Sequence, residues 1–274
     1  MNHPQIAAFA RLAKENTLPT RALEGQKTLI SRTMHALAYD SVHDEIIVNS
    51  PLAQAILIFR GGANGEEAPI RVIQGPHTQI QGTDYDGNDQ MAFDEVHGEI
   101  YIPVDRNKIL TFSREANGDV APLRVLAGPD TQMRGSVRGH VRVGVDPVHN
   151  LLIVTSTGMG DPNGAASMLI FDRTANGNVK PRSVIKGPTT QVGAGSAAHV
   201  SAEKGMIIAG CGAGSVCAWS INDSGDVPPR WKIPVQQIAG VAPSGIALDP
   251  AHKEVIITSG NRNRVMTFSW PEVF

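Results

Sequence analysis

Aspartate and histidine recur together in this sequence with the spacing Asp-x-x-His, and such pairs could bind a metal or transfer protons. The pairs are Asp40/His43, Asp94/His97, Asp146/His149 and Asp249/His252. Each pair lies in a predicted turn between two short apolar segments, so the four pairs should lie far apart. An aspartate in a turn accepts hydrogen bonds from backbone N–H groups. We therefore expect the pairs to stabilise turns rather than to form one site.

An acidic segment, GTDYDGNDQ at 82–90, offers the hard oxygen ligands that calcium prefers. The candidate ligands are Asp84, Asp86, Asn88 and Asp89. Glycine stands at the fourth position of this loop, whereas calcium loops of the helix-flanked type have it at the sixth. Calcium is thus the one cofactor that the sequence suggests, and a solvated acidic loop is the alternative.

A basic segment, RGSVRGHVRVGVD at 134–146, alternates in the manner of a strand. The alternation places Arg138, His140 and Arg142 on one face. Arginine suits the recognition of a carboxylate or phosphate, although ion pairs within the protein explain such a cluster equally. His35 and His199 occupy similar places in other segments, and with His140 they offer a transition-metal site or ordinary hydrogen bonds.

Two cysteines, Cys211 and Cys217, flank the short segment GAGSV. A hairpin there would bring them opposite each other, so they form a disulfide in an oxidising compartment and stay reduced in the cytosol. No second Cys-x-x-Cys pair accompanies them, which argues against structural zinc.

The elements that position these residues belong to an internal repeat of about 50 residues, the period of a propeller or solenoid. One half of the repeat reads LAYDSVHDEIIVNS at 37–50 and returns at 91–104, 143–156 and 246–259, with a degraded copy at 199–210. The other half reads AILIFRGGANGEEAPIRVIQGPHTQ at 55–79 and returns at 109–132, 168–191 and 216–237. A further copy of this second half opens the chain at Ile6.

Each repeat contains four short apolar segments separated by turn signals, here called strands a, b, c and d. Asn-Gly or Ser-Gly stands between c and d, where positive φ allows a tight hairpin. A glycine, usually followed by proline, ends strand d at Gly75, Gly128 and Gly187. Four antiparallel strands per repeat make a propeller blade. The sequence therefore predicts an all-β, five-bladed β-propeller, with six blades as the alternative.

We expect one domain over 1–274, with full blades at 34–82, 90–134, 140–193 and 197–240. The last repeat, 244–274, lacks strand d, while residues 18–30 supply a strand d without a and b. Pairing of residues 20–28 with 264–270 would close the last blade and cover an exposed sheet edge. Both ends carry a copy of strand c; we favour 264–270 as the strand and expect residues 6–16 to pack outside it, for instance as a helix.

The repeated pattern I-x-x-F-x-x-x-A-N-G-x-x-x-P-x-R-x-I-x-G-P-x-T, followed by A-x-D-x-x-x-x-x-I-x-V, resembles NHL-type β-propellers of bacteria. The resemblance covers almost the whole chain. It implies export to the periplasm or the medium, although no signal peptide is visible and a cytoplasmic location is the alternative. Proteins of this kind include protein-binding scaffolds, nucleic-acid binders and, among six-bladed relatives, calcium-dependent lactonases and arylesterases.

Composition narrows the function classes. The 24 Lys and Arg balance 26 Asp and Glu, so no basic field favours nucleic acid, and no apolar run is long enough for membrane insertion. Nucleophile elbow, Walker, dinucleotide and zinc-protease motifs are absent from the sequence. We expect a non-catalytic scaffold that binds a protein partner or a small anionic ligand through loops such as 82–90 and 156–167 and through the channel mouth.

The alternative is a metal-dependent lactonase-like or arylesterase-like hydrolase, with calcium at the axis polarising an ester carbonyl. That chemistry needs a ring of carboxylates and asparagines where the strands a begin. This sequence instead has His35, Gln90, Arg142 and Gly245 at those places. An enzyme is therefore the less favoured reading.

Overall fold

The computed structural model describes residues 5–31, 34, 36–80, 90–104, 107–135, 141–156, 164–193, 198–212, 214–259 and 262–274. The chain divides into two compact units, Met1–Asp105 with Leu110–Leu123, and Arg106–Ile109 with Arg124–Phe274. Each unit is described by itself.

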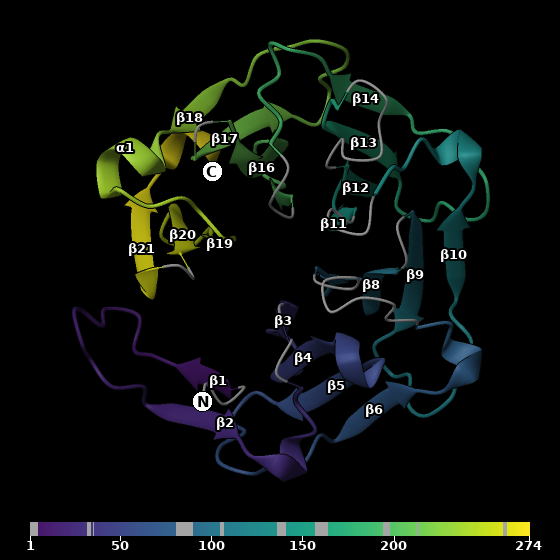
Figure 1. The fold of residues 1–274 in the computed structure, drawn as a ribbon, viewed down its shortest axis with the longest axis vertical. Coiled ribbons are helices and arrows are strands. Elements are labelled where there is room, and N and C mark those ends of the chain that lie inside the picture. Colours follow the sequence, from purple (N-terminus) through teal and green to yellow (C-terminus); the bar gives the residue numbers. More distant parts are fainter. Residues whose placement is uncertain are drawn as a thin grey trace. The chain divides into compact units, whose positions relative to one another are not determined.

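Four antiparallel sheets have four strands each, and in every one of them the strands a, b, c and d lie side by side in chain order (Figure 1). The first is β3 (Ala36–Asp40), β4 (Glu45–Ser50), β5 (Ala55–Arg60) and β6 (Arg71–Gln74). The second is β7 (Ala92–Asp94), β8 (Glu99–Val104), β9 (Lys108–Ser113) and β10 (Arg124–Ala127). The third is β11 (Arg142–Asp146), β12 (Leu151–Ser156), β13 (Ser167–Asp172) and β14 (Ser183–Lys186). The fourth is β15 (His199–Ser201), β16 (Met206–Cys211), β17 (Ser215–Ser220) and β18 (Trp231–Ile233).

Two smaller sheets come from the ends of the chain. They are the pair β1 (Gln5–Ala8) and β2 (Arg21–Glu24), and the three strands β19 (Gly245–Asp249), β20 (Glu254–Ser259) and β21 (Arg264–Ser269). Helical structure in the described part of the chain consists of single turns between or after strands, among them η1 (Gln26–Thr28), η2 (Pro51–Ala53), η3 (Pro76–Thr78), η4 (Pro129–Thr131), α1 (Val235–Ala239) and η6 (Pro271–Val273).

Strands b and c are apolar along nearly their whole length because both of their faces are covered. Every residue of β4 and of β12 is buried, and the sequences EIIVNS and LLIVTS are continuous rather than alternating. In the second unit, residues from β12, β13, β14, β16 and β17 form one apolar cluster that includes the buried indole of Trp219. The Trp219 Nε1–H donates to the Thr190 carbonyl at 3.2 Å, so this large side chain is buried without an unsatisfied donor.

Each c–d turn contacts strand d of the sheet that precedes it in the chain. Gly65 N–H donates to the Ala22 carbonyl at 2.8 Å, and the Gly65 carbonyl accepts from Glu24 N–H at 3.0 Å. The side-chain Oδ1 of Asn64 accepts from Ala22 N–H at 3.1 Å. The same parallel bridge recurs at Ile73–Gly118, Leu126–Gly177 and Ile185–Gly225. We call this contact the turn clamp; it covers the outer edge of strand d.

A second repeated contact follows each clamp. Gly75 lies between the end of β6 and the start of η3, and Thr78 Oγ1–H donates to the Gly75 carbonyl at 2.6 Å. Asp119, just after the next c–d turn, accepts from His77 N–H at 2.7 Å. Gly75 has φ 135°, and a Cβ built there would lie 2.3 Å from Asp119 Cγ. Glycine is therefore required both by the backbone and by the neighbouring carboxylate.

The N-terminal copy of strand c differs from the helix that the sequence suggested for residues 6–16. Residues 5–8 form the strand β1, which pairs antiparallel with β2 in the register Ile6–Leu23. The expected helix is wrong here, because Ile6 and Leu23 pack in the apolar cluster of the β3–β6 sheet, and this packing decides the local structure. The expected pairing of residues 20–28 with 264–270 is wrong as well, because β1 binds one edge of β2, Gly65 binds the other, and residues 26–28 form the turn η1.

Gly75→Ala is expected to reduce the free energy of unfolding by about 1–3 kcal/mol, because alanine is strained at this φ and its methyl group displaces Asp119. Gly62→Ala is the matched control, since nothing lies within 4 Å of a Cβ there. Urea unfolding of both variants measures the difference. Equal stability of the two variants would contradict the proposed requirement for glycine.

Candidate functional site

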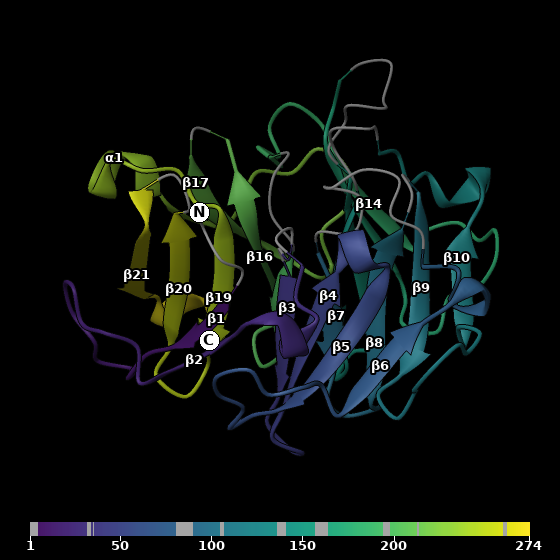
Figure 2. The same cartoon turned by 60° about the horizontal axis from the view of Figure 1, so that its bottom comes forward.

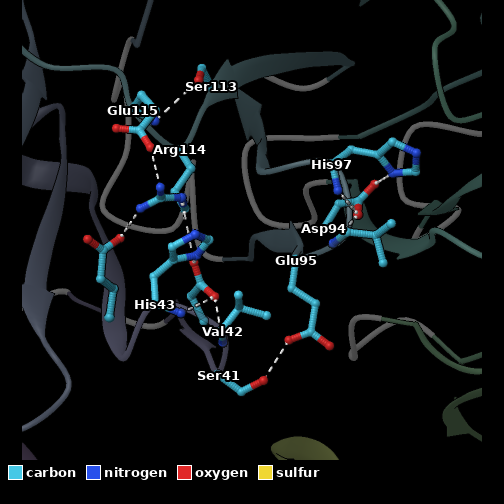
Figure 3. Close-up of polar contacts among 12 residues, drawn as sticks. Ser41, Val42, His43, Asp94, Glu95, His97, Ser113, Arg114 and Glu115 are labelled. Atoms are coloured by element: carbon cyan, nitrogen blue, oxygen red, sulfur yellow. Dashed lines mark hydrogen bonds and ion pairs between the residues drawn. The ribbon is translucent and has the colours of Figure 1, made fainter.

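The Asp-x-x-His pairs hold the a–b turns. Asp94 Oδ1 accepts from the N–H groups of Val96 and His97 at 3.0 Å each, and Asp94 Oδ2 lies 2.8 Å from His97 Nδ1 (Figure 3). Asp40 and Asp146 make the same three contacts in their turns, and Asp249 binds the N–H and Nδ1 of His252. The structural interpretation of these pairs is confirmed: each carboxylate is occupied by its own turn.

A charged network in the first unit joins the β3–β6 sheet to the turn that follows β9. The Glu45 carboxylate accepts from Arg71 Nη2 at 2.6 Å and from Arg114 Nη1 at 2.9 Å. Arg114 Nε lies 3.7 Å from Asp40 Oδ2, and its Nη2 also binds Glu115. Figure 3 shows Arg114 at the centre of these contacts. Three carboxylates surround two guanidinium groups here, so the network stabilises the fold and leaves no uncompensated positive charge for an anionic ligand.

Burial alone would raise the pKa of the Glu45 carboxyl, but hydrogen bonds from Arg71 and Arg114 outweigh it and hold the pKa below its ordinary value. A carboxyl whose pKa is lower in the folded state stabilises the fold fully above its unfolded pKa. The stabilisation is lost as the pH falls through the lower, folded value.

Glu45→Gln is expected to cost about 1–3 kcal/mol near neutral pH, because two guanidinium groups lose their charged acceptor. The difference in stability between wild type and variant should narrow as the pH falls below the ordinary glutamate value of 4.5. Urea midpoints over a pH series measure this. Glu67→Gln, which breaks an exposed pair with Arg60, should have a smaller effect. A pH-independent difference for Glu45→Gln would contradict the linkage.

The predicted ligand residues are only partly described. The calcium candidates Asp84, Asp86, Asn88 and Asp89 lie outside the described residues, as do His35, Arg138 and His140. Arg142 begins β11 and His199 begins β15. In the parts of the chain that the structure describes, no three His, Cys, Asp or Glu side chains gather closely enough to hold a metal ion.

His199 lies on strand a, where burial lowers its pKa to about 4. The imidazole is therefore neutral near neutral pH and adds no positive charge at this place.

A small polar cavity lies at one end of the β11–β14 sheet, with a volume of about 80 Å³. It is lined by Gln132, Arg134, Ser156, Ala165, Ser167, Leu169, Val184 and Lys186. Among the lining residues that the structure describes, two side chains are cationic and none is a carboxylate. Sequence reasoning missed this cavity, although Arg134 opens the basic segment 134–146, because the lining comes from three strand ends and a connection that are distant in sequence.

Cys211 and Cys217 form a disulfide that closes the b–c turn between β16 and β17, with their Cα atoms 5.8 Å apart. Both sulfurs are buried in the apolar cluster of the second unit. Next to the bridge, Gly212 N–H donates to the Gln191 carbonyl at 2.9 Å, and Gln236 N–H donates to the Gly214 carbonyl at 2.9 Å. The disulfide thus fixes a turn to which two other segments are hydrogen-bonded.

Cys211→Ala with Cys217→Ala is expected to lower the free energy of unfolding by about 2 kcal/mol, the entropic effect of a short loop. Urea unfolding without reductant gives the value. Adding reductant should lower the free energy of unfolding of the wild type to that of the double variant. The value for the double variant should not change. Thiol titration checks that reduction is complete. If the fully reduced wild type keeps its free energy of unfolding, the disulfide does not stabilise the fold.

Comparisons with known proteins were made for sequence and for structure. No family model matches the chain, and no curated protein matches it in sequence. Among solved structures, it is similar to the crystal structure of the β-propeller domain of Cps50 (Swd1) from Myceliophteria thermophila. The TM-score is 0.56 at 10% sequence identity, and the match covers 86% of this chain but 64% of that domain. The chain is a five-bladed β-propeller.

At this identity the similarity shows the fold of the propeller and nothing more. The resemblance to NHL-type proteins and the expected export stay predictions. Among the described residues of this propeller, no helix has the length and apolar character needed to cross a membrane.

Proposed function

We propose that this propeller is a non-catalytic scaffold that binds a protein partner or a small ligand at the connection end of its sheets. The connection end is the end that carries the b–c and d–a connections. The turn end is the opposite one, which carries the a–b and c–d turns.

The observation that supports this assignment is that the polar side chains which recur in the repeats already form hydrogen bonds within the protein. At the turn end, Asp40, Asp94 and Asp146 are fully buried and each bind two backbone N–H groups and one imidazole. The asparagines of the c–d turns bind the preceding strand d. Aspartates and asparagines that already have these partners are poorly suited to bind a metal ion or to activate a water.

The connection end differs from this pattern. Its segments 82–90 and 156–167 differ in sequence from the corresponding connections of the other repeats. The cavity beside Arg134 and Lys186 also lies at this end, on the β11–β14 sheet. Loops that vary on a rigid scaffold are the usual carriers of binding, so this end is where a partner is expected.

A hydrolase of the lactonase or arylesterase type has less support. Gln90, Arg142 and Gly245 stand where strands a begin, and these residues offer a cation and an amide rather than carboxylates. Calcium chemistry would then depend on Asp84, Asp86, Asn88 and Asp89 in one connection.

We expect a protein partner to co-purify with the propeller from its native source. Replacing Asp84, Asp86 and Asp89 with Asn should reduce the recovered partner about tenfold, the effect of losing about 1.4 kcal/mol of binding. The control replaces three exposed carboxylates, Glu15, Glu203 and Glu272, with Gln and so changes the net charge equally.

Equal recovery with both triple variants would reject the loop 82–90 as the binding surface. Turnover of esters that stops on addition of a chelator would instead overturn the scaffold assignment. Both measurements use the full-length chain, and circular dichroism checks that each variant is folded.

A further inference from the structure

We propose that Asn64 is a site of spontaneous modification, the first of the clamp asparagines to deamidate, and that its conversion releases the pair β1–β2 from the β3–β6 sheet. The inference is independent of the proposed binding function. It concerns Asn64 and Gly65, a dipeptide that recurs at 117–118 and 176–177 in the next two turn clamps. The fourth Asn-Gly dipeptide of the chain, at 163–164, begins outside the described residues.

An asparagine that precedes glycine is prone to deamidation, because glycine has no Cβ to hinder attack on the neighbouring side chain. The Gly65 nitrogen loses its proton and attacks Asn64 Cγ. The new N–C bond closes a succinimide ring, and the side-chain nitrogen leaves as ammonia. Water then opens the ring at either carbonyl and gives aspartate or isoaspartate. The reaction needs no reactant other than water.

The turn clamp opposes this reaction at all three sites. Gly65 N–H donates to the Ala22 carbonyl at 2.8 Å, which favours the protonated nitrogen. Asn64 Oδ1 accepts from Ala22 N–H at 3.1 Å, which holds the side chain in place. The same side-chain bond recurs at 3.0 Å for Asn117 and at 2.9 Å for Asn176, and all three asparagines are exposed to water. A clamp must therefore open before its asparagine reacts.

The three clamps differ in the strand that they hold. The clamp at Asn64 holds β2, which among the described strands pairs with β1 alone, and no residue of β1 is buried. The clamp at Asn117 holds β6, whose neighbour β5 is buried along nearly its whole length. The clamp at Asn176 holds β10, which also belongs to a four-stranded sheet. A two-stranded pair is marginally stable by itself, so β2 should leave its clamp more often than β6 or β10.

The second contact that follows each clamp differs in the same direction. At the first clamp it is one hydrogen bond among the described residues, from Gln26 N–H to Glu66 Oε1 at 3.2 Å. At the second clamp, Asp119 accepts from His77 N–H at 2.7 Å and lies 2.6 Å from His77 Nδ1. At the third clamp, two bonds of 2.8 and 3.2 Å join the corresponding residues. The clamp at Asn64 thus has the weakest support.

Conversion to isoaspartate removes the clamp permanently. Isoaspartate adds a carbon atom to the main chain before Gly65, so the Gly65 N–H and carbonyl no longer both reach the backbone on either side of Leu23. The outer edge of β2 is then uncovered. What remains is the apolar packing of Ile6 and Leu23 and the bond from Arg21 Nη2 to the Gly61 carbonyl at 2.7 Å. A two-stranded pair held by these contacts should unfold locally.

Peptide mass spectrometry of the full-length chain, incubated in its folded state at mildly alkaline pH, measures the deamidation of each asparagine. Asn64 should react at least about tenfold faster than Asn117 and Asn176, the factor by which one hydrogen bond to a carboxylate changes an opening equilibrium. In urea, where no clamp exists, the three rates should be similar. Equal rates in the folded protein, or a faster reaction at Asn117 or Asn176, would overturn the proposal.

Asp119→Ala tests whether clamp opening sets the rate. The variant loses the second contact of the second clamp, so Asn117 should react faster than in the wild type. Asn176 in the same sample should keep its rate, and the rates in urea correct for the change in neighbouring sequence. An unchanged rate at Asn117 would show that the clamp contacts do not control deamidation, and the ranking would fail.

Tryptic cleavage after Arg21 measures the release of β1–β2, because a protease cuts within a strand only after local unfolding. Incubated protein with isoaspartate at position 64 should be cut after Arg21 faster than fresh protein. Cleavage after Lys186, at the end of β14, is the control and should not change. Equal cleavage of both samples after Arg21 would show that deamidation does not release the pair.

Discussion

The turn clamp is the contact on which the rest of the fold depends. Strand d forms the outer edge of every four-stranded sheet, and an uncovered edge offers its N–H and C=O groups to other chains. In each unit, a glycine of the next c–d turn binds this edge, as Gly65 binds the backbone on either side of Leu23. Figure 2 shows the strands β3 to β6, the sheet whose c–d turn contains Gly65. One repeat is incomplete alone, because its strand d is covered only when the next repeat is present.

The clamp also explains how structure and function are divided between the two ends of each sheet. The c–d turn must keep its shape to fit the preceding strand, and the a–b turn beside it is held by a buried aspartate. Both turns at this end are therefore constrained in sequence. The b–c connections, and the parts of the d–a connections beyond the 3-10 turns, differ in sequence between repeats and can carry binding residues.

Local signals in the sequence were sufficient to predict the strands, the tight c–d turns and the role of the Asp-x-x-His pairs. Each of these depends on residues close together in the chain. The structure of residues 5–8 depended instead on packing of Ile6 against another sheet, and alanine-rich composition wrongly favoured a helix. The Glu45–Arg114 network and the Arg134–Lys186 cavity join residues that are far apart in sequence and occur once. A repeat pattern contains no information on such contacts.

Departures from the repeat are nevertheless interpretable once the structure is known. Gly61 stands where Arg114 follows strand c in the next repeat. A Cβ at Gly61 would lie 1.8 Å from Asp44 Oδ1, and this same oxygen accepts from the Tyr39 hydroxyl at 2.7 Å. Glycine is thus imposed at this position by a side chain of the same sheet.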